Sequence, residues 1–98
     1  MSQVENKTIY IKASQSKQVS NKRIVISDVL DIISLDNDAV KRVGDVVLHT
    51  VKGDKNEKVI FSITKVINLI QKECPAFSIV NIGEPDFVVE YKMPVKPN

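Results

Sequence analysis

Apolar and polar positions alternate along several short stretches of this chain, and a two-residue period is typical of half-buried β-strands. In residues 8–12 (TIYIK), the two isoleucines share one face and the other three side chains share the opposite face. Residues 14–21 are rich in Ser, Gln, Lys and Asn, which indicates a loop or an irregular strand around Val19. Further extended segments are predicted over 23–26, 45–51, 58–61, 77–82 and 87–91.

The clearest helical pattern lies over residues 63–74. Ser62 is the expected N-cap, because its hydroxyl accepts a hydrogen bond from a free backbone N–H of the first turn. Pro75 is expected to end the helix, since proline pushes the residue before it out of the helical region. Apolar residues recur there at the spacing of one helix face, namely Ile63, Val66, Ile67, Ile70 and Cys74.

Two shorter helices are predicted over 28–34 and 38–43. Ser27 is the expected N-cap of the first helix, and acidic residues follow in its first turn, where the helix dipole favours them. Gly44 is expected to end the second helix by adopting a positive φ. The apolar face of the first helix is formed by Val29, Ile32 and Ile33.

These elements predict an α+β fold. We expect a small mixed, mainly antiparallel sheet of about three to five strands, with two or three helices on one face. The charged turn 52–57 is expected to join two strands into a hairpin, and residues 81–86 are expected to join the last two strands in the same way. Residues 8–92 form the predicted domain, preceded by a disordered N-terminus over 1–7 and followed by a linker over 93–98.

Composition limits the core and the class of protein. The 98 residues suffice for one domain, and 43% of them are hydrophobic, as is ordinary for a globular protein. Aromatic residues make up only 5% and Trp is absent, so Ile, Val and Leu must fill the core. No apolar run approaches the roughly 20 residues that a membrane helix needs, and we expect the chain as given to be soluble.

Positive charge is concentrated near the start of the chain. The net charge is only +2, which is too small to indicate strong nucleic-acid binding. Residues 1–27, however, carry five basic residues and one acidic residue. They form either an ordinary solvated face or a basic edge that meets an acidic partner or an anionic membrane surface. The candidate residues for that edge are Lys12, Lys17 and Lys22.

Residue types that carry catalytic chemistry are few. His49 is the only histidine and has no second ligand at metal-binding spacing, so we interpret it as a structural or surface residue. Cys74 falls on the apolar stripe of the last helix and is interpreted as a buried core thiol. The carboxylates between Asp28 and Asp38 lack the calcium-loop pattern and are interpreted as helix caps and solvated ends. We therefore predict no enzyme, no cofactor and no metal.

Three parts of the chain, taken in order, resemble a known family. They are the opening strand TIYIK, the segment VISDVLDII, and the C-terminal block over 58–91, which contains QKECP and IVNIGEPDFVVEY. Together they resemble the N-terminal soluble domain of the stage V sporulation protein AA family, over residues 8–92. These motifs are structural, so the specificity of the resemblance rests on their number and order. The segment SQSKQVSNK is more polar than the family pattern leads us to expect.

The resemblance implies a function that the residues alone do not. Members of this family belong to a sporulation membrane complex that carries dipicolinic acid into the forespore and releases it at germination. Their soluble domain precedes two membrane-spanning segments, toward which the linker over 93–98 would lead. The resemblance thus implies a non-catalytic assembly or gating domain that contacts other subunits of the complex.

The location of the domain and a second function class remain open at this point. The parent complex resides in the forespore or spore inner membrane. The lack of a signal peptide and the single thiol favour the cytoplasmic, core-facing side. The alternative function is a free-standing module that binds nucleic acid or a small ligand. Its only aromatic–basic pairs would be Tyr10 with Lys12 and Tyr91 with Lys92.

Overall fold

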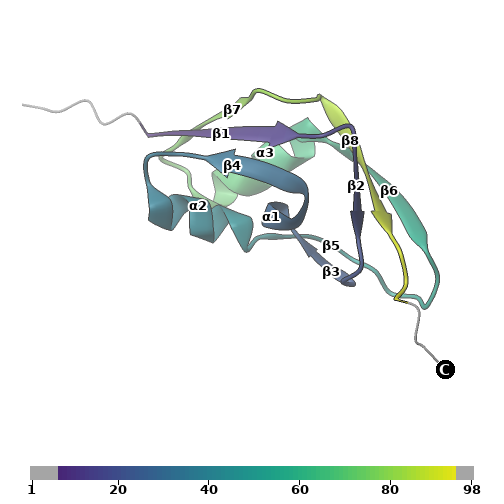
Figure 1. The fold of residues 1–98 in the computed structure, drawn as a ribbon. Coiled ribbons are helices and arrows are strands. Elements are labelled where there is room, and N and C mark those ends of the chain that lie inside the picture. Colours follow the sequence, from purple (N-terminus) through teal and green to yellow (C-terminus); the bar gives the residue numbers. More distant parts are fainter. Residues whose placement is uncertain (1–6, 95–98) are drawn as a thin grey trace, which may run out of the picture.

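Two pairs of consecutive strands run side by side through the molecule and bend at the same place. β1 (Thr8–Ala13) leads into β2 (Ser16–Val19), and β7 (Ser78–Asn81) leads into β8 (Asp86–Tyr91). β1 pairs in parallel with β7, and β2 pairs in parallel with β8 (Figure 1). Each chain segment therefore contributes first to one sheet and then to another.

The computed structural model describes residues 7–94. The disordered N-terminus predicted over 1–7 and the linker predicted over 93–98 fall mostly outside this range. Within it, the carbonyl of Lys7 accepts a hydrogen bond from the Ser78 N–H at 2.8 Å. The N–H of Met93 donates to the side chain of Asn56 at 2.7 Å, so the first residue of the predicted linker contacts the loop over residues 51–56.

Gly83 lies at the bend, where the two backbones come closest. A Cβ on Gly83 would lie 2.5 Å from the backbone nitrogen of Ala13 and 2.8 Å from its carbonyl oxygen. Paired residues differ by 70 positions before the bend (Ile11 with Asn81) and by 72 after it (Ser16 with Val88). The β7–β8 segment therefore contains two additional residues, and only glycine fits where they cross the neighbouring chain.

The α+β prediction is confirmed, and the strands divide among three small sheets. The β1 sheet has the order β4-β1-β7, with β4 at Leu30–Ile33. The β8 sheet has the order β2-β8-β6, with β6 at Glu57–Ser62. A two-stranded sheet pairs β3 (Arg23–Val25) with β5 (Val47–Thr50).

Both predicted hairpins are wrong, because the strands pair with partners far along the chain. β5 pairs with β3 rather than with β6, and β6 pairs with β8. β7 and β8 pair with β1 and β2 instead of with each other. Turn signals between two strands show that the chain changes direction there, but the pairing is decided by packing over the whole sheet.

The helix predicted over 28–34 is also wrong. The helical turn α1 spans only Ile26–Val29, and the following residues form β4, which pairs antiparallel with β1. Ser27 lies inside this turn and does not cap it. The Asp28 carboxylate accepts a hydrogen bond from the Val25 N–H at 3.1 Å and holds the start of the turn. The isoleucines that follow are β-branched and fit the pleated surface of a sheet.

The other two helices are confirmed. α3 spans Ile63–Glu73, and its N-cap Ser62 accepts a hydrogen bond from the Thr64 N–H at 3.3 Å. α2 spans Asn37–Gly44, and the Asp36 carboxylate accepts from the Ala39 N–H at 3.1 Å. Gly44 is the last residue of α2 and has no positive φ, so that part of the prediction is wrong. A Cβ there would lie 3.1 Å from the Ser27 Cβ, so α2 and α1 pack closely at this point.

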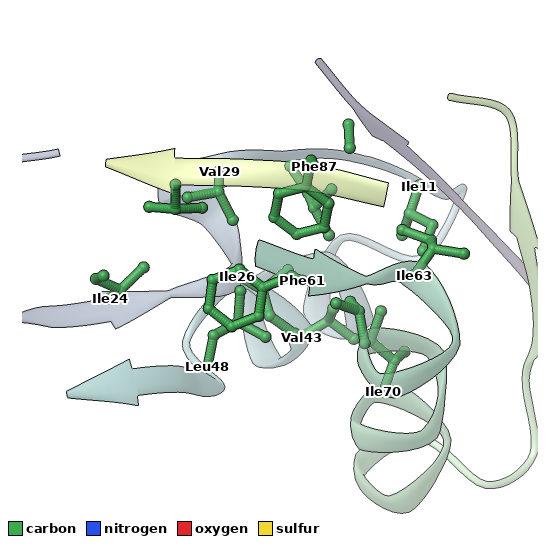
Figure 2. Packing of buried hydrophobic residues seen from close by; sticks show 14 of the residues in the cluster. Ile11, Ile24, Ile26, Val29, Val43, Leu48, Phe61, Ile63, Ile70 and Phe87 are labelled. Atoms are coloured by element: carbon green, nitrogen blue, oxygen red, sulfur yellow. The ribbon is translucent and has the colours of Figure 1, made fainter. Parts of the chain in front are cut away.

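The core is mainly aliphatic and also holds the Tyr91 ring, the Cys74 thiol and a pair of stacked rings. Phe61 on β6 and Phe87 on β8 stack with ring centroids 5.4 Å apart, beneath the β8 sheet. Isoleucines and valines from the strands and from all three helices surround them (Figure 2). The helices lie on one side of the β1 sheet (Figure 1). Among residues 7–94, no helix or strand covers the opposite side of that sheet (Figure 1).

Candidate docking surface

The open face of the β1 sheet carries a row of apolar side chains. Tyr10 on β1 is the Cα partner of Ile33 on β4 and of Val80 on β7. The three side chains are 37%, 51% and 39% exposed, respectively. Adjacent side chains on one sheet face touch each other, so these three form one continuous apolar row across the sheet. We call Tyr10, Ile33 and Val80 the apolar row.

The alternation of β1 explains why Tyr10 faces solvent. Ile9, Ile11 and Ala13 point inward and are buried against the helices. Every second residue must then point outward, so Tyr10 and Lys12 lie on the open face. Ile82 continues the apolar row along β7, because its N–H donates to the Ile11 carbonyl at 2.8 Å and extends the ladder.

Polar residues lie on both sides of the apolar row. On one side Lys12 is the Cα partner of Asp31, and on the other side Thr8 is the Cα partner of Ser78. Within the described part of the chain, neither Lys12 nor Asp31 takes part in an ion pair. An apolar centre with a polar rim is the usual arrangement of a protein–protein interface. The face therefore has the chemistry of a docking surface.

The sheet topology adds to this argument. The inner face of the β1 sheet is covered by helices, as is normal for a two-layer α+β domain. Antiparallel or mixed sheets of this kind usually keep their open face polar, whereas sheets with two apolar faces are covered on both. The apolar row on the open face is therefore unusual for a sheet of this kind.

The structure brings together two of the three residues of the predicted basic edge. Lys12 and Lys17 line one small hollow of about 40 Å³, which also borders Asp28 and Asp31. The acidic residues offset the positive charge there, and a hollow of this size has room for little more than a water molecule.

Lys22 lies apart from that hollow, beyond the far end of β2, and its ammonium contacts the Asp54 carboxylate at 2.9 Å. This hydrogen bond raises the pKa of Lys22 and holds the pKa of Asp54 below its ordinary value. The basic edge therefore remains a prediction carried by Lys12 and Lys17, with Lys22 engaged in a separate ion pair.

The residue types that can act in catalysis or metal binding make structural contacts in this protein. The His49 ring nitrogen Nε2 lies 2.7 Å from a Glu57 carboxylate oxygen, which joins β5 to β6. Cys74 is 3% exposed, which confirms the prediction of a core thiol, and burial raises the pKa of its thiol. Tyr91 is buried, so it offers no ring on which a nucleic-acid base might stack.

Sequence reasoning missed most of the apolar row. It placed Tyr10 on the polar face of a strand, but it assigned Ile33 to a helix and paired Val80 with the wrong strand. The available signal was the adjacent pair Ile32 and Ile33, since two neighbouring apolar residues in a strand must lie on opposite faces. That signal identifies an outward apolar residue only after β4 is recognised as a strand.

Fold and surface together define a class: a small α+β domain with an exposed apolar row on one sheet face. The chain belongs to the stage V sporulation protein AA family, because the model of that family, described as "Stage V sporulation protein AA", matches residues 6–94. Family membership gives it a role in sporulation. No helix within residues 7–94 has the length and apolar character required to span a membrane.

A similar fold is found among the solved structures. It occurs in the crystal structure of a functionally unknown protein from Eubacterium ventriosum ATCC 27560, which is 30% identical to this chain. The match covers 90% of this chain and 97% of that chain, with a TM-score of 0.77. None of the curated proteins matches this chain.

Proposed function

We propose that this chain is a non-catalytic assembly or gating domain of a sporulation membrane complex, the one that moves dipicolinic acid into the forespore and releases it at germination. The observation that carries the proposal is the apolar row on the open face of the β1 sheet. The solute does not bind to this domain; the domain docks other subunits near the pore. Its place on the core-facing side of the inner membrane is part of the same proposal.

The use of the polar side chains supports a scaffold role. Asp28 and Asp36 hold the starts of helices, and His49 joins two strands through Glu57. A catalytic site needs such groups to converge on a reacting atom. Here each of them supports local structure, whereas three exposed apolar side chains, Tyr10, Ile33 and Val80, lie side by side on one sheet face.

The test places charge on the apolar row of the full-length protein in sporulating cells. We expect Tyr10→Lys combined with Val80→Lys to reduce co-purification of the protein with other subunits at least tenfold, and to lower the dipicolinic acid content of the spores. A charge in the centre of a docking face must be desolvated without a partner, which costs several kcal/mol. The change lies on an exposed face, so the isolated variant domain should keep its circular dichroism spectrum.

Ile60→Lys provides the matched control. Ile60 lies on the outward face of the other large sheet and is 72% exposed. Its replacement by lysine therefore also puts a positive charge in place of an exposed apolar side chain, but away from the apolar row. We expect it to leave co-purification unchanged. The proposal is wrong if the variant with lysines in the apolar row assembles as well as the Ile60→Lys control does.

A further inference from the structure

The charges beside the apolar row make the open face self-complementary. Lys12 and Asp31 lie next to each other across β1 and β4, and neither takes part in an ion pair within the described residues. A surface that carries a cation beside an anion can meet a copy of itself across a two-fold axis, with each charge facing the opposite one. Tyr10 then lies at the centre of the contact, against its own counterpart.

Strand geometry agrees with this arrangement. Lys12 lies two residues, or about 6.6 Å, from Tyr10 along β1. Asp31 lies beside Lys12 on the neighbouring strand, about 4.8 Å away. Consider a two-fold axis that lies between the two facing sheets, parallel to both, and passes over Tyr10. If this axis sets Lys12 of one copy over Asp31 of the other, the β1 strands of the two copies cross at roughly 35°. Twisted sheets that pack face to face cross at about 30°. The crossing angle that the charge pairs require is thus close in size to that of packed sheets.

We propose that the open face of the β1 sheet binds a second copy of this chain, forming a two-fold dimer in which Lys12 of each copy contacts Asp31 of the other. This inference rests on the proposed function: the partner seated on that face is a second copy of the chain, and it is the dimer that docks the other subunits. The face is three strands wide and offers a few hundred Å² of apolar area. A stable interface buries about 800 Å² on each side. The isolated domains should therefore associate weakly, so that the dimer forms only at high protein concentration.

The test is sedimentation equilibrium of the isolated chain over the range from about 10 µM to 1 mM, with Lys12→Asp and Asp31→Lys as single variants. The Lys12→Asp copy presents only acids at these positions, and the Asp31→Lys copy presents only bases, so each should stay monomeric. An equimolar mixture of the two should form heterodimers, because every contact then joins opposite charges. Folding of each variant is checked by its thermal unfolding, which should change little for exposed residues.

The outcomes separate this inference from the proposed function. A native chain that stays monomeric at 1 mM overturns the dimer, as does a mixture of the two variants that remains monomeric while the native chain dimerises. If lysines at Tyr10 and Val80 abolish assembly in sporulating cells but the native chain never self-associates, the face binds a different subunit and only the dimer fails. If the chain dimerises through this face and assembly in cells ignores the lysines, the proposed function fails and the dimer stands.

Discussion

The two three-stranded sheets share two continuous chain segments, yet they present different chemistry to solvent. On the β1 sheet, one register row across the open face is apolar from edge to edge. On the β8 sheet, one outward row mixes polar and aliphatic residues and another is entirely polar. Those rows are Ser16 with Val88 and Ile60, and Gln18 with Glu90 and Lys58. Isolated exposed aliphatic residues such as Ile60 are normal on protein surfaces, whereas a continuous row is not.

The difference shows that alternation and docking are separate properties of a strand. Both sheets follow the inward–outward period that buries one face, so both fold by the same rule. What distinguishes them is the identity of the outward residues, which the fold does not require to be apolar. The apolar row is therefore not a requirement of the fold, and the β8 sheet serves as the internal control for surface variants.

The largest expected effect comes from breaking the core of the β8 sheet. Phe87→Ala removes a buried ring that stacks on Phe61, and we expect it to lower the free energy of unfolding by about 3–5 kcal/mol. Ile11→Ala removes a buried aliphatic side chain beneath the β1 sheet and should lower the free energy of unfolding by about 2–5 kcal/mol. Because β1–β2 and β7–β8 run through both sheets, each variant should unfold in one transition by denaturant titration, followed by circular dichroism. Two separate transitions would show that the sheets are independent units.

Gly83→Ala sharpens the comparison at the junction of the two sheets. The added methyl would meet the Ala13 backbone, so both chains must move apart at the bend, and we expect a loss of about 2 kcal/mol or more. Gly53→Ala is the matched control, because a Cβ there has only Lys55 N nearby, at 3.9 Å. Gly53→Ala should stabilise the protein by a few tenths of a kcal/mol, because alanine lowers the conformational entropy of the unfolded chain. Equal effects on the denaturation midpoint would contradict the close approach at Gly83.

The local elements were predictable from sequence, whereas the sheet pairings were not. α2, α3 and β1 can be predicted because the capping residues and the spacing of apolar residues that define each of them lie within the segment itself. β4 was mistaken for a helix because Val29, Ile32 and Ile33 fit a helical face, and only its pairing with β1 decides for a strand. Gly83 lies in the predicted turn 81–86, but glycine is required there because the backbone of Ala13, 70 residues away, leaves no room for a side chain. The apolar row depends on three strands distant in sequence, so no single segment could reveal it.

A smaller effect is expected at the helix that covers the inner side of the β1 sheet. Asp36→Ala removes the side chain that caps α2 at the Ala39 N–H, and we expect a loss of about 1 kcal/mol. Asp38→Ala removes a carboxylate from the same turn without removing the cap, so it should cost only a few tenths of a kcal/mol. Denaturant titration of both variants gives the difference. If the two losses are equal, the dipole rather than the cap holds the start of α2.

The smallest expected effect concerns the ion pair of Lys22 with Asp54, beyond the far end of the β8 sheet. Its pKa shifts have opposite signs, so the pair contributes to stability only inside a pH window. The contribution of Asp54 is complete above its ordinary pKa of 3.8 and is lost as pH falls through its lowered folded value. The contribution of Lys22 is complete below its ordinary pKa of 10.5 and is lost as pH rises through its raised folded value.

Both side chains face solvent, so salt should screen the pair. We expect Lys22→Gln to lower the thermal midpoint slightly at pH 7 in low salt. The difference from the native chain should vanish at 1 M NaCl, and Lys52→Gln in the neighbouring loop should show neither effect. A difference that persists in high salt would mean that Lys22 stabilises this end of the β8 sheet through packing of its hydrocarbon chain. Lys22 would then belong to the scaffold and not to a basic edge that meets a partner.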